Sequence, residues 1–229
     1  WGFIIHFILA GCLTYGFLRA LGLGFHASLI GGLAYMMSGP IAAYVSPGHD
    51  GKLFVSSLLP LSLWMLTRWI RDARAWAVGA LALTIGLGVL SPHPQLLQYL
   101  LLASGSFALY LALAGRDGGV VLPRGEAVKR LGLALGAVVL GAAIGAIQYL
   151  PVREYVGWSP RAGGAGWDHA ISFSMPTEEL LNAFIPQFSG ILDRYWGRNG
   201  LHFHSEYAGV VVLLLAGAGM FAARFRRSL

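Results

Sequence analysis

The sequence predicts an all-α membrane protein with about seven transmembrane helices. Of its 229 residues, 56% are hydrophobic and only 11% are charged, whereas soluble domains carry roughly 25% charged residues. The apolar residues gather in runs of roughly 20, the length that a helix needs to cross a bilayer with its backbone groups paired internally. Composition and run length together exclude an ordinary soluble domain.

Seven apolar segments follow one another along the chain, and the first six are separated by short polar runs. They extend from Gly2 to Leu18, Ala27 to Val45, Leu53 to Ile70, Ala75 to Leu90, Leu96 to Ala114, Leu131 to Leu150 and Ala208 to Ala223. We therefore expect a six-helix bundle in residues 1–150, an external loop in residues 151–207, and a last helix with a basic tail in residues 208–229.

The distribution of Lys and Arg predicts the orientation of these segments. One set of alternate connections holds eleven cations: Arg19, Arg68, Arg71, Arg74, Arg116, Arg124, Lys129, Arg130, Arg224, Arg226 and Arg227. The other set holds five: Lys52, Arg153, Arg161, Arg194 and Arg198. Because positively charged connections stay in the cytoplasm, we expect the N-terminus outside and the C-terminus inside.

The long external loop is expected to contain short helices. Pro176 to Ile185 has an amphipathic pattern, with Thr177 as a candidate N-cap and Glu178 and Glu179 in the first turn. Acidic side chains in that turn oppose the helix dipole favourably.

Two polar runs on the predicted outer side are the strongest candidates for a binding site. The first contains His49, Asp50 and Lys52, and the second contains His93 and Gln95. Lys52 and the amides at the start of a helix suit an anionic lipid phosphate, and Asp50 is a weak candidate for a catalytic acid. The alternative is that both runs are ordinary turns, since Pro, Gly and Asp are turn residues in any protein.

Metal and cofactor sites have weaker signals. His202, His204 and Glu206 alternate as three zinc ligands on one face of a strand would, but no fourth ligand is identifiable. His6, inside the first segment, has no second histidine to pair with across the bundle, which favours a hydrogen-bonded packing residue over a ligand of haem or chlorophyll. We predict no cofactor other than a possible divalent metal ion.

Small residues also recur within the segments. Gly132, Gly136, Gly141 and Gly145 form two pairs spaced by four in the sixth segment. Such spacing favours close packing of helices in lipid.

Several short motifs together resemble the YfhO family of large bacterial membrane proteins, which are similar to glycosyltransferases of the GT-C architecture. These motifs are Met37-Ser38-Gly39-Pro40 with Gly48-His49, Gln148-Tyr149-Leu150-Pro151 with Glu154, Ser159 and Arg161, Pro176 to Pro186, and Glu206-Tyr207-Ala208-Gly209. Their order and membrane sides agree with the family.

The resemblance implies transfer of a sugar from a polyprenyl-phosphate carrier at the outer face of the bacterial cytoplasmic membrane. His49, Lys52, His93, Gln95 and Arg161 would then contact phosphate or sugar. The catalytic acid of GT-C enzymes usually follows the first membrane helix, so we expect it to precede Trp1, in a longer parent protein.

Two other interpretations remain. The chain could be a non-catalytic subunit of a larger membrane complex, energy-transducing or pigment-bearing, or a transporter of a lipid-linked saccharide. Its net charge of +6 divides between the two membrane sides, so the expected partners are membrane lipids and not nucleic acid.

Overall fold

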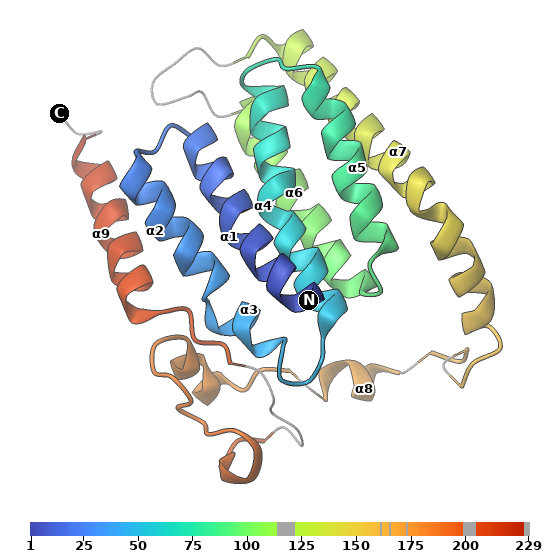
Figure 1. Cartoon of the computed structure of the whole chain (residues 1–229), viewed down its shortest axis with the longest axis vertical. Helices are drawn as coiled ribbons and strands as arrows, with labels where there is room; N and C mark the ends of the chain where they lie inside the picture. The colour runs from blue at the N-terminus through green and yellow to red at the C-terminus, as the bar shows by residue number, and fades with distance from the viewer. Residues whose placement is uncertain (114–121, 161, 165, 173, 199–204, 227–229) are drawn as a thin grey trace. The chain divides into compact units, whose positions relative to one another are not determined.

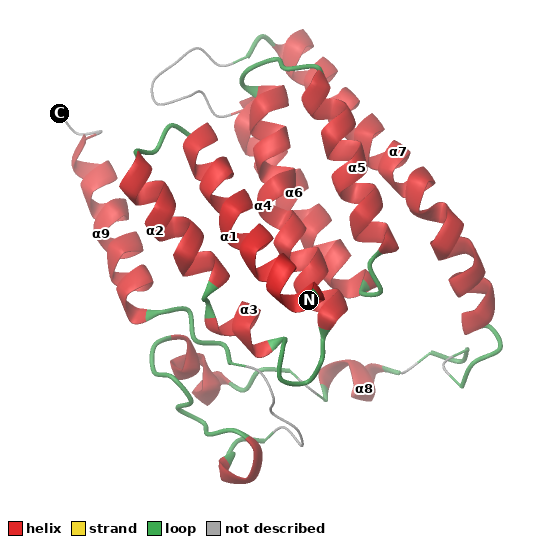
Figure 2. Cartoon of the chain, viewed as in Figure 1, coloured by secondary structure: helices red, strands yellow, loops and turns green. Residues whose placement is uncertain are grey.

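Helices make up the regular secondary structure of the part of the chain that the structure describes (Figure 2). The computed structural model describes all residues except 114–121, 161, 165, 173, 199–204 and 227–229. The α-helices are α1 (Gly2–Ala20), α2 (Phe25–Met36), α3 (Gly39–Ala43), α4 (Asp50–Ile70), α5 (Trp76–Leu90), α6 (Pro94–Leu113), α7 (Arg124–Val156), α8 (Trp167–Ile171) and α9 (Val210–Arg226). Two 3₁₀ helices, η1 (Thr177–Ala183) and η2 (Leu192–Arg194), complete the set.

The chain divides into two compact units. The first comprises Trp1–Leu33 and Asp50–Ala162, and the second comprises Ala34–His49 and Gly163–Leu229. The first unit therefore contains the long helices α1, α4, α5, α6 and α7, and the second contains α3, α8, η1, η2 and α9.

Four helices are long and apolar enough to cross a membrane, namely α1, α4, α6 and α7, and α5 and α9 are apolar but shorter. These helices identify the chain as a membrane protein. Each overlaps a segment that hydropathy predicted, with ends shifted by a few residues except at α7.

In the first unit, α4 is the helix against which the others assemble (Figure 1). It packs against α1, α5 and α6, and α7 packs along α5. Leu53, Val55 and Ile70 of α4 are at most 1% exposed, and Leu81 and Ile85 of α5 are as deeply buried. A bundle in which one helix contacts several others explains why α4 is the most buried of the candidate spans.

The second apolar segment differs from the prediction of one continuous helix from Ala27 to Val45. The chain leaves α2 after Met36, Ser38 takes an extended conformation (φ −63°, ψ 148°), and the short α3 follows. Pro40 lies in the first turn of α3 and lacks an N–H donor, so it cannot supply the backbone hydrogen bond that would continue α2 through this stretch.

Helix α7 is longer than its predicted segment at both ends. Its 33 residues span about 50 Å, at 1.5 Å per residue, which exceeds the roughly 30 Å of hydrocarbon in a bilayer. The helix continues through Pro151 to Val156, so the first part of the predicted external loop is helical.

The amphipathic helix predicted at Pro176 to Ile185 is a 3₁₀ helix, and Thr177 is not its N-cap. Pro176 occupies the cap position without a side-chain cap, and the Thr177 hydroxyl instead donates to Glu178 Oε2 at 3.4 Å. The two acidic residues do lie in the first turn, as expected.

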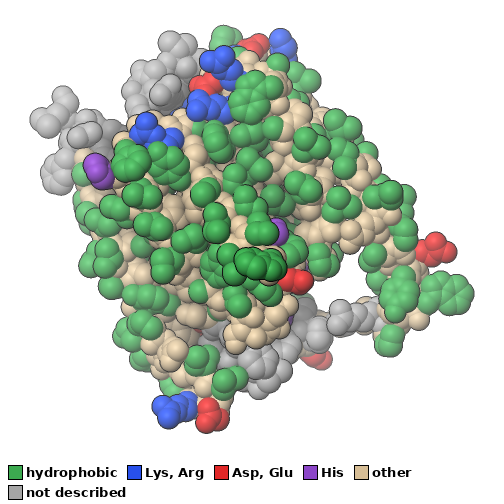
Figure 3. Space-filling model, viewed as in Figure 1, with side chains coloured by type: hydrophobic (Ala, Val, Ile, Leu, Met, Phe, Trp, Pro, Cys, Tyr) green, Lys and Arg blue, Asp and Glu red, His purple; other side chains and the backbone are tan. Residues whose placement is uncertain are grey.

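On the face that Figure 3 shows, hydrophobic side chains are spread over the long helices of the first unit, and Lys and Arg gather at the end where α4 ends and α7 begins. Leu102 of α6 and Leu135 and Val139 of α7 are 63–67% exposed. Many exposed apolar side chains on neighbouring long helices favour apolar surroundings such as lipid.

Candidate functional site

The first polar run begins α4, three residues earlier than hydropathy predicted. Asp50 is the first residue of the helix, and its Oδ1 accepts a hydrogen bond from the Gly51 amide at 2.7 Å. The carboxylate therefore stabilises the positive end of the helix dipole. Asp50 is exposed and Lys52, two residues on, is half-buried.

The turn between α5 and α6 lies directly against this helix start. Ser91 Oγ donates to the Gly51 carbonyl at 3.2 Å. Gly51 is buried, and a Cβ atom there would lie 3.1 Å from Pro92 Cγ and 3.4 Å from His93 Cβ. The structure thus brings the two polar runs together at one end of the bundle, and Gly51 permits the close approach.

His93 also has a structural role, as the N-cap of α6. Its Nδ1 accepts a hydrogen bond from the Leu96 amide at 3.3 Å, while its carbonyl accepts one from Leu97 at 3.2 Å. An accepting Nδ1 carries no proton, so the proton of the neutral ring is on Nε2. Nε2 is the nitrogen that such a ring would present to a ligand.

Gln95 is positioned less favourably for binding. Its side-chain Nε2 donates to the Tyr99 hydroxyl at 3.0 Å, along the exposed surface of α6.

His49 belongs to the second unit. Its amide donates to the Tyr44 carbonyl at 2.9 Å in the turn before α4. We call Asp50, Lys52, Ser91 and His93 the polar end of the first unit.

A second polar cluster, in the second unit, was not predicted. Glu179 of η1 is only 1% exposed, and its Oε1 accepts a short hydrogen bond from the Tyr195 hydroxyl. Asn182, one 3₁₀ turn later, donates from Nδ2 to Ser189 Oγ at 2.8 Å and accepts at Oδ1 from the Ser189 amide at 3.0 Å. The i, i+3 spacing of Glu179 and Asn182 was the available signal, because side chains at that spacing eclipse in a 3₁₀ helix.

Three of the motifs on which the family resemblance rests meet in the same unit. The Gly39 amide donates to the Tyr207 carbonyl at 3.1 Å, and the Ala208 amide donates to the Ala183 carbonyl at 3.1 Å. A Cβ atom at Gly39 would lie 2.6 Å from the Tyr207 oxygen. Any side chain at position 39 would clash with this main-chain oxygen. Close packing therefore explains the glycine in the Met37-Ser38-Gly39-Pro40 motif.

The remaining candidates are not assembled into a site by the described residues. Arg161, His202 and His204 lie outside the part that the structure describes, and Glu206 lies within it, partly buried. Among the described residues, no group of three His, Cys, Asp or Glu side chains could hold a metal ion. His6 makes the hydrogen bond expected of a packing residue, from Nδ1 to the Gly2 carbonyl at 2.8 Å, and its ring stacks on Phe54.

The chain matches no model of a known protein family, no curated protein and no solved structure. By its helices and polar groups, the described part of the chain is an all-helical membrane protein whose first unit has a polar end and whose second unit has a separate polar cluster.

Proposed function

We propose that the chain is a GT-C-like protein of the bacterial cytoplasmic membrane that binds a polyprenyl-phosphate-linked sugar at the outer face, as its motifs resembling the YfhO family imply. The observation that carries this proposal is the contact between the start of α4 and the α5–α6 turn. That contact brings a cation, Lys52, and an imidazole, His93, to the same end of the helix bundle. A lipid phosphate requires such an end, with hydrocarbon on one side and positive charge on the other.

The proposed topology has seven spans, with the N-terminus outside. Within the first unit, Arg19 is in the last turn of α1, Arg68 is in the last turn of α4, and Arg124 begins α7. The opposite helix ends carry Lys52 and Arg153. This asymmetry supports an orientation in which the cation-rich end faces the cytoplasm. The polar end would then face the outside of the cell.

The proposed chemistry assigns Lys52 to the phosphate, with His93 Nε2 as a second donor. Asp50 is the candidate for the base that deprotonates an acceptor hydroxyl: its Oδ1 accepts the Gly51 amide hydrogen bond, so Oδ2 would take the proton. The proposed role of the polar end is therefore to bind the phosphate of the carrier.

Lipid binding by the polar end tests the proposal. The protein in nanodiscs is titrated with a short-chain polyprenyl phosphate, and binding is followed by native mass spectrometry. We expect Lys52→Met to weaken binding by roughly tenfold, the equivalent of 1.4 kcal/mol, and Lys52→Arg to preserve most of it. Lys129→Met, which removes an exposed cation of α7, is the matched control, and equal affinities for Lys52→Met and Lys129→Met would refute the assignment.

A non-catalytic subunit is the second candidate, and the outer face of α7 favours it. Gly141 and Gly145 pack against α5, whereas Cβ atoms at Gly132 and Gly136 would meet nothing within 4 Å. Two glycines spaced by four on an exposed helix face suit a transmembrane helix from another chain. Purification in mild detergent distinguishes the candidates: a stoichiometric partner that is lost on Gly136→Leu supports the subunit, and an isolated protein with bound polyprenyl phosphate supports the first proposal.

A further inference from the structure

An apolar groove of about 400 Å³ lies within the first unit, lined by α4, α5, α6 and α7. Its floor includes Leu66, Leu81 and Ile85, which are at most 2% exposed. Its rims include Leu109 of α6 and Leu135 of α7, which are 51% and 65% exposed. A cavity of about 150 Å³ accommodates benzene, so this groove can hold a considerably larger hydrocarbon.

The polar atoms near the groove are already satisfied. Ser104 is the lining residue with a hydroxyl, and its Oγ shares a 2.7 Å hydrogen bond with Ser62 Oγ of α4. The groove therefore offers a ligand no polar contact along its length, and a hydrocarbon chain is the ligand class that it fits.

The groove extends from the middle of the bundle toward the cation-rich end. Leu66 is one turn from the end of α4, Leu109 is one turn from the end of α6, and Leu131 follows Arg130 near the start of α7. A chain lying in the groove would thus bring its head group to the end where Lys and Arg gather (Figure 3).

Arg124 is the cation placed to meet that head group. It precedes Leu131 by seven residues and Leu135 by eleven, so the 3.6-residue period places it on the groove face of α7. Arg124 is exposed. Arg130, by contrast, is bonded to Glu126 and to the Ile70 carbonyl.

We propose that the groove binds one acyl chain of an anionic phospholipid from the bilayer leaflet at the cation-rich end, and that Arg124 pairs with its phosphate. The site is distinct from the polar end, which lies at the other ends of the same helices. The occupant is an ordinary lipid of the membrane, so the site would make the protein associate preferentially with anionic lipids. This binding does not depend on a sugar carrier.

Gly105 gives the sharpest test, because a Cβ atom there would meet nothing within 4 Å and yet the residue lines the groove. Gly105→Leu should extend a side chain into the groove from an unobstructed Cβ position and also favour the helix. Gly79→Leu is the matched control: its Cβ also meets nothing within 4 Å, but it shares the outer face of α5 with Leu83 and Leu87.

The experiment measures binding of phosphatidylglycerol and phosphatidylcholine to delipidated protein by native mass spectrometry. The unmodified protein should bind one phosphatidylglycerol more tightly than phosphatidylcholine. Gly105→Leu should weaken both lipids by roughly tenfold or more, and Gly79→Leu should weaken neither. Arg124→Gln should abolish the preference for phosphatidylglycerol while preserving binding of phosphatidylcholine.

A double truncation of the rims, Leu109→Ala with Leu135→Ala, covers the case in which Gly105→Leu fails to fold. Both side chains are more than half exposed, so their truncation leaves the core intact and should still weaken binding. Equal affinities for Gly105→Leu, the rim variant and Gly79→Leu would overturn the groove as the site. An unchanged head-group preference in Arg124→Gln would overturn the pairing with phosphate.

Discussion

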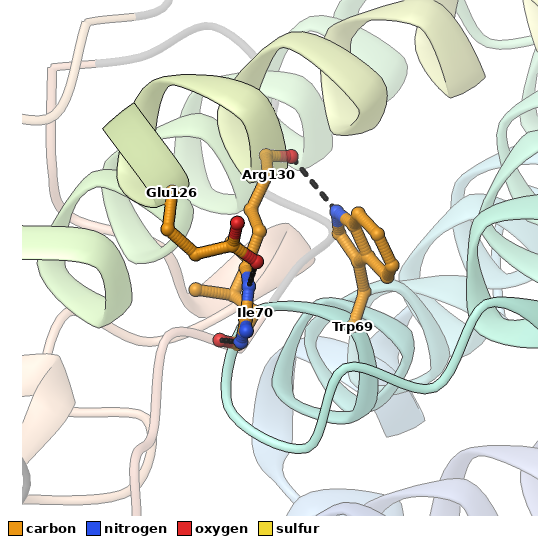
Figure 4. Close-up of polar contacts among 4 residues, drawn as sticks. All are labelled: Trp69, Ile70, Glu126 and Arg130. Carbon is orange, nitrogen blue, oxygen red and sulfur yellow. Dashed lines mark hydrogen bonds and ion pairs between the residues drawn. The ribbon is translucent and has the colours of Figure 1, made fainter. Parts of the chain in front are cut away.

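The indole N–H of Trp69 donates a 2.8 Å hydrogen bond to the carbonyl of Arg130, and Arg130 Nη1 in turn donates to the carbonyl of Ile70 at 2.6 Å (Figure 4). These two bonds join the last turn of α4 to the first turns of α7. Arg130 Nε also pairs with Glu126 at 2.7 Å. The last carbonyls of a helix have no partner within it, so Arg130 caps α4 from a different helix.

Removing this cap should cost more than removing an ordinary surface ion pair. Arg130, whose side chain is 12% exposed, loses bonds to Ile70 and Glu126 in Arg130→Met, and we expect stability to fall by about 1–3 kcal/mol. Arg68→Met breaks the Arg68–Asp72 pair, whose side chains are 35% and 28% exposed, and should cost about 0–1 kcal/mol. Chemical unfolding in detergent measures both values, and equal losses would show that the link between α4 and α7 contributes nothing.

The two glycine pairs of α7 should respond oppositely to the same substitution. A Cβ atom at Gly141 would lie 2.6 Å from the Ala82 carbonyl and 2.7 Å from Ile85 Cβ, so Gly141→Ala should destabilise by about 1–3 kcal/mol through overpacking. Gly136→Ala meets no atom within 4 Å and should stabilise by up to about 1 kcal/mol. Thermal unfolding of both variants in the same detergent measures the two changes in stability. A Gly141→Ala variant as stable as the unmodified protein would contradict the close packing of α5 and α7.

These glycines also show what the sequence could not distinguish. Both pairs have the same spacing, and the membrane-spanning part of α7 is apolar on every side. Hydropathy therefore cannot predict which face of the helix is buried. The two prolines Pro40 and Pro151 were equally hard to interpret from sequence. Helix α2 ends before Pro40, whereas α7 continues through Pro151. Membrane helices tolerate proline where neighbouring groups satisfy the released carbonyl, and those neighbours are not legible from local sequence.

The polar end was more predictable than the cluster around Glu179. Two polar runs separated by a pair of apolar segments must return to the same membrane side, which is why Gly51 and His93 could be expected near each other. Glu179 and Tyr195 are joined across a loop without periodicity. No rule of spacing connects such positions, and the burial of Glu179 depends on the whole loop.

The ion pair between Glu178 and Arg198 should make the loop sensitive to acid. Its atoms lie 2.8 Å apart, and the pKa of Glu178 is lowered from the ordinary 4.5 by its own backbone N–H first and then by Arg198. Because the folded pKa is the lower one, the stabilisation is present above pH 4.5 and is lost as pH falls through the folded pKa.

An NMR titration of the Glu178 side chain, with hydrogen exchange of η1 amides, measures this dependence. We expect Arg198→Gln to move the midpoint upward toward 4.5 and Glu178→Gln to reduce the pH dependence of exchange. Asp193→Asn changes another exposed acid of the same loop and serves as the control. A midpoint that stays in place in Arg198→Gln would show that the arginine does not act on Glu178.

The two hydrogen bonds between Asn182 and Ser189 should stabilise the folded conformation of the loop after η1. Both residues are at most 2% exposed, and Asn182→Ala leaves the Ser189 amide and hydroxyl without these bonds. A buried polar group that loses its partner costs about 1–3 kcal/mol, so the loop should open more often and limited proteolysis near Ser189 should accelerate. Asn182→Asp preserves the acceptor for the Ser189 amide and should be cleaved more slowly than Asn182→Ala at neutral pH. Equal cleavage of Asn182→Ala and the unmodified protein would mean that other contacts hold the loop.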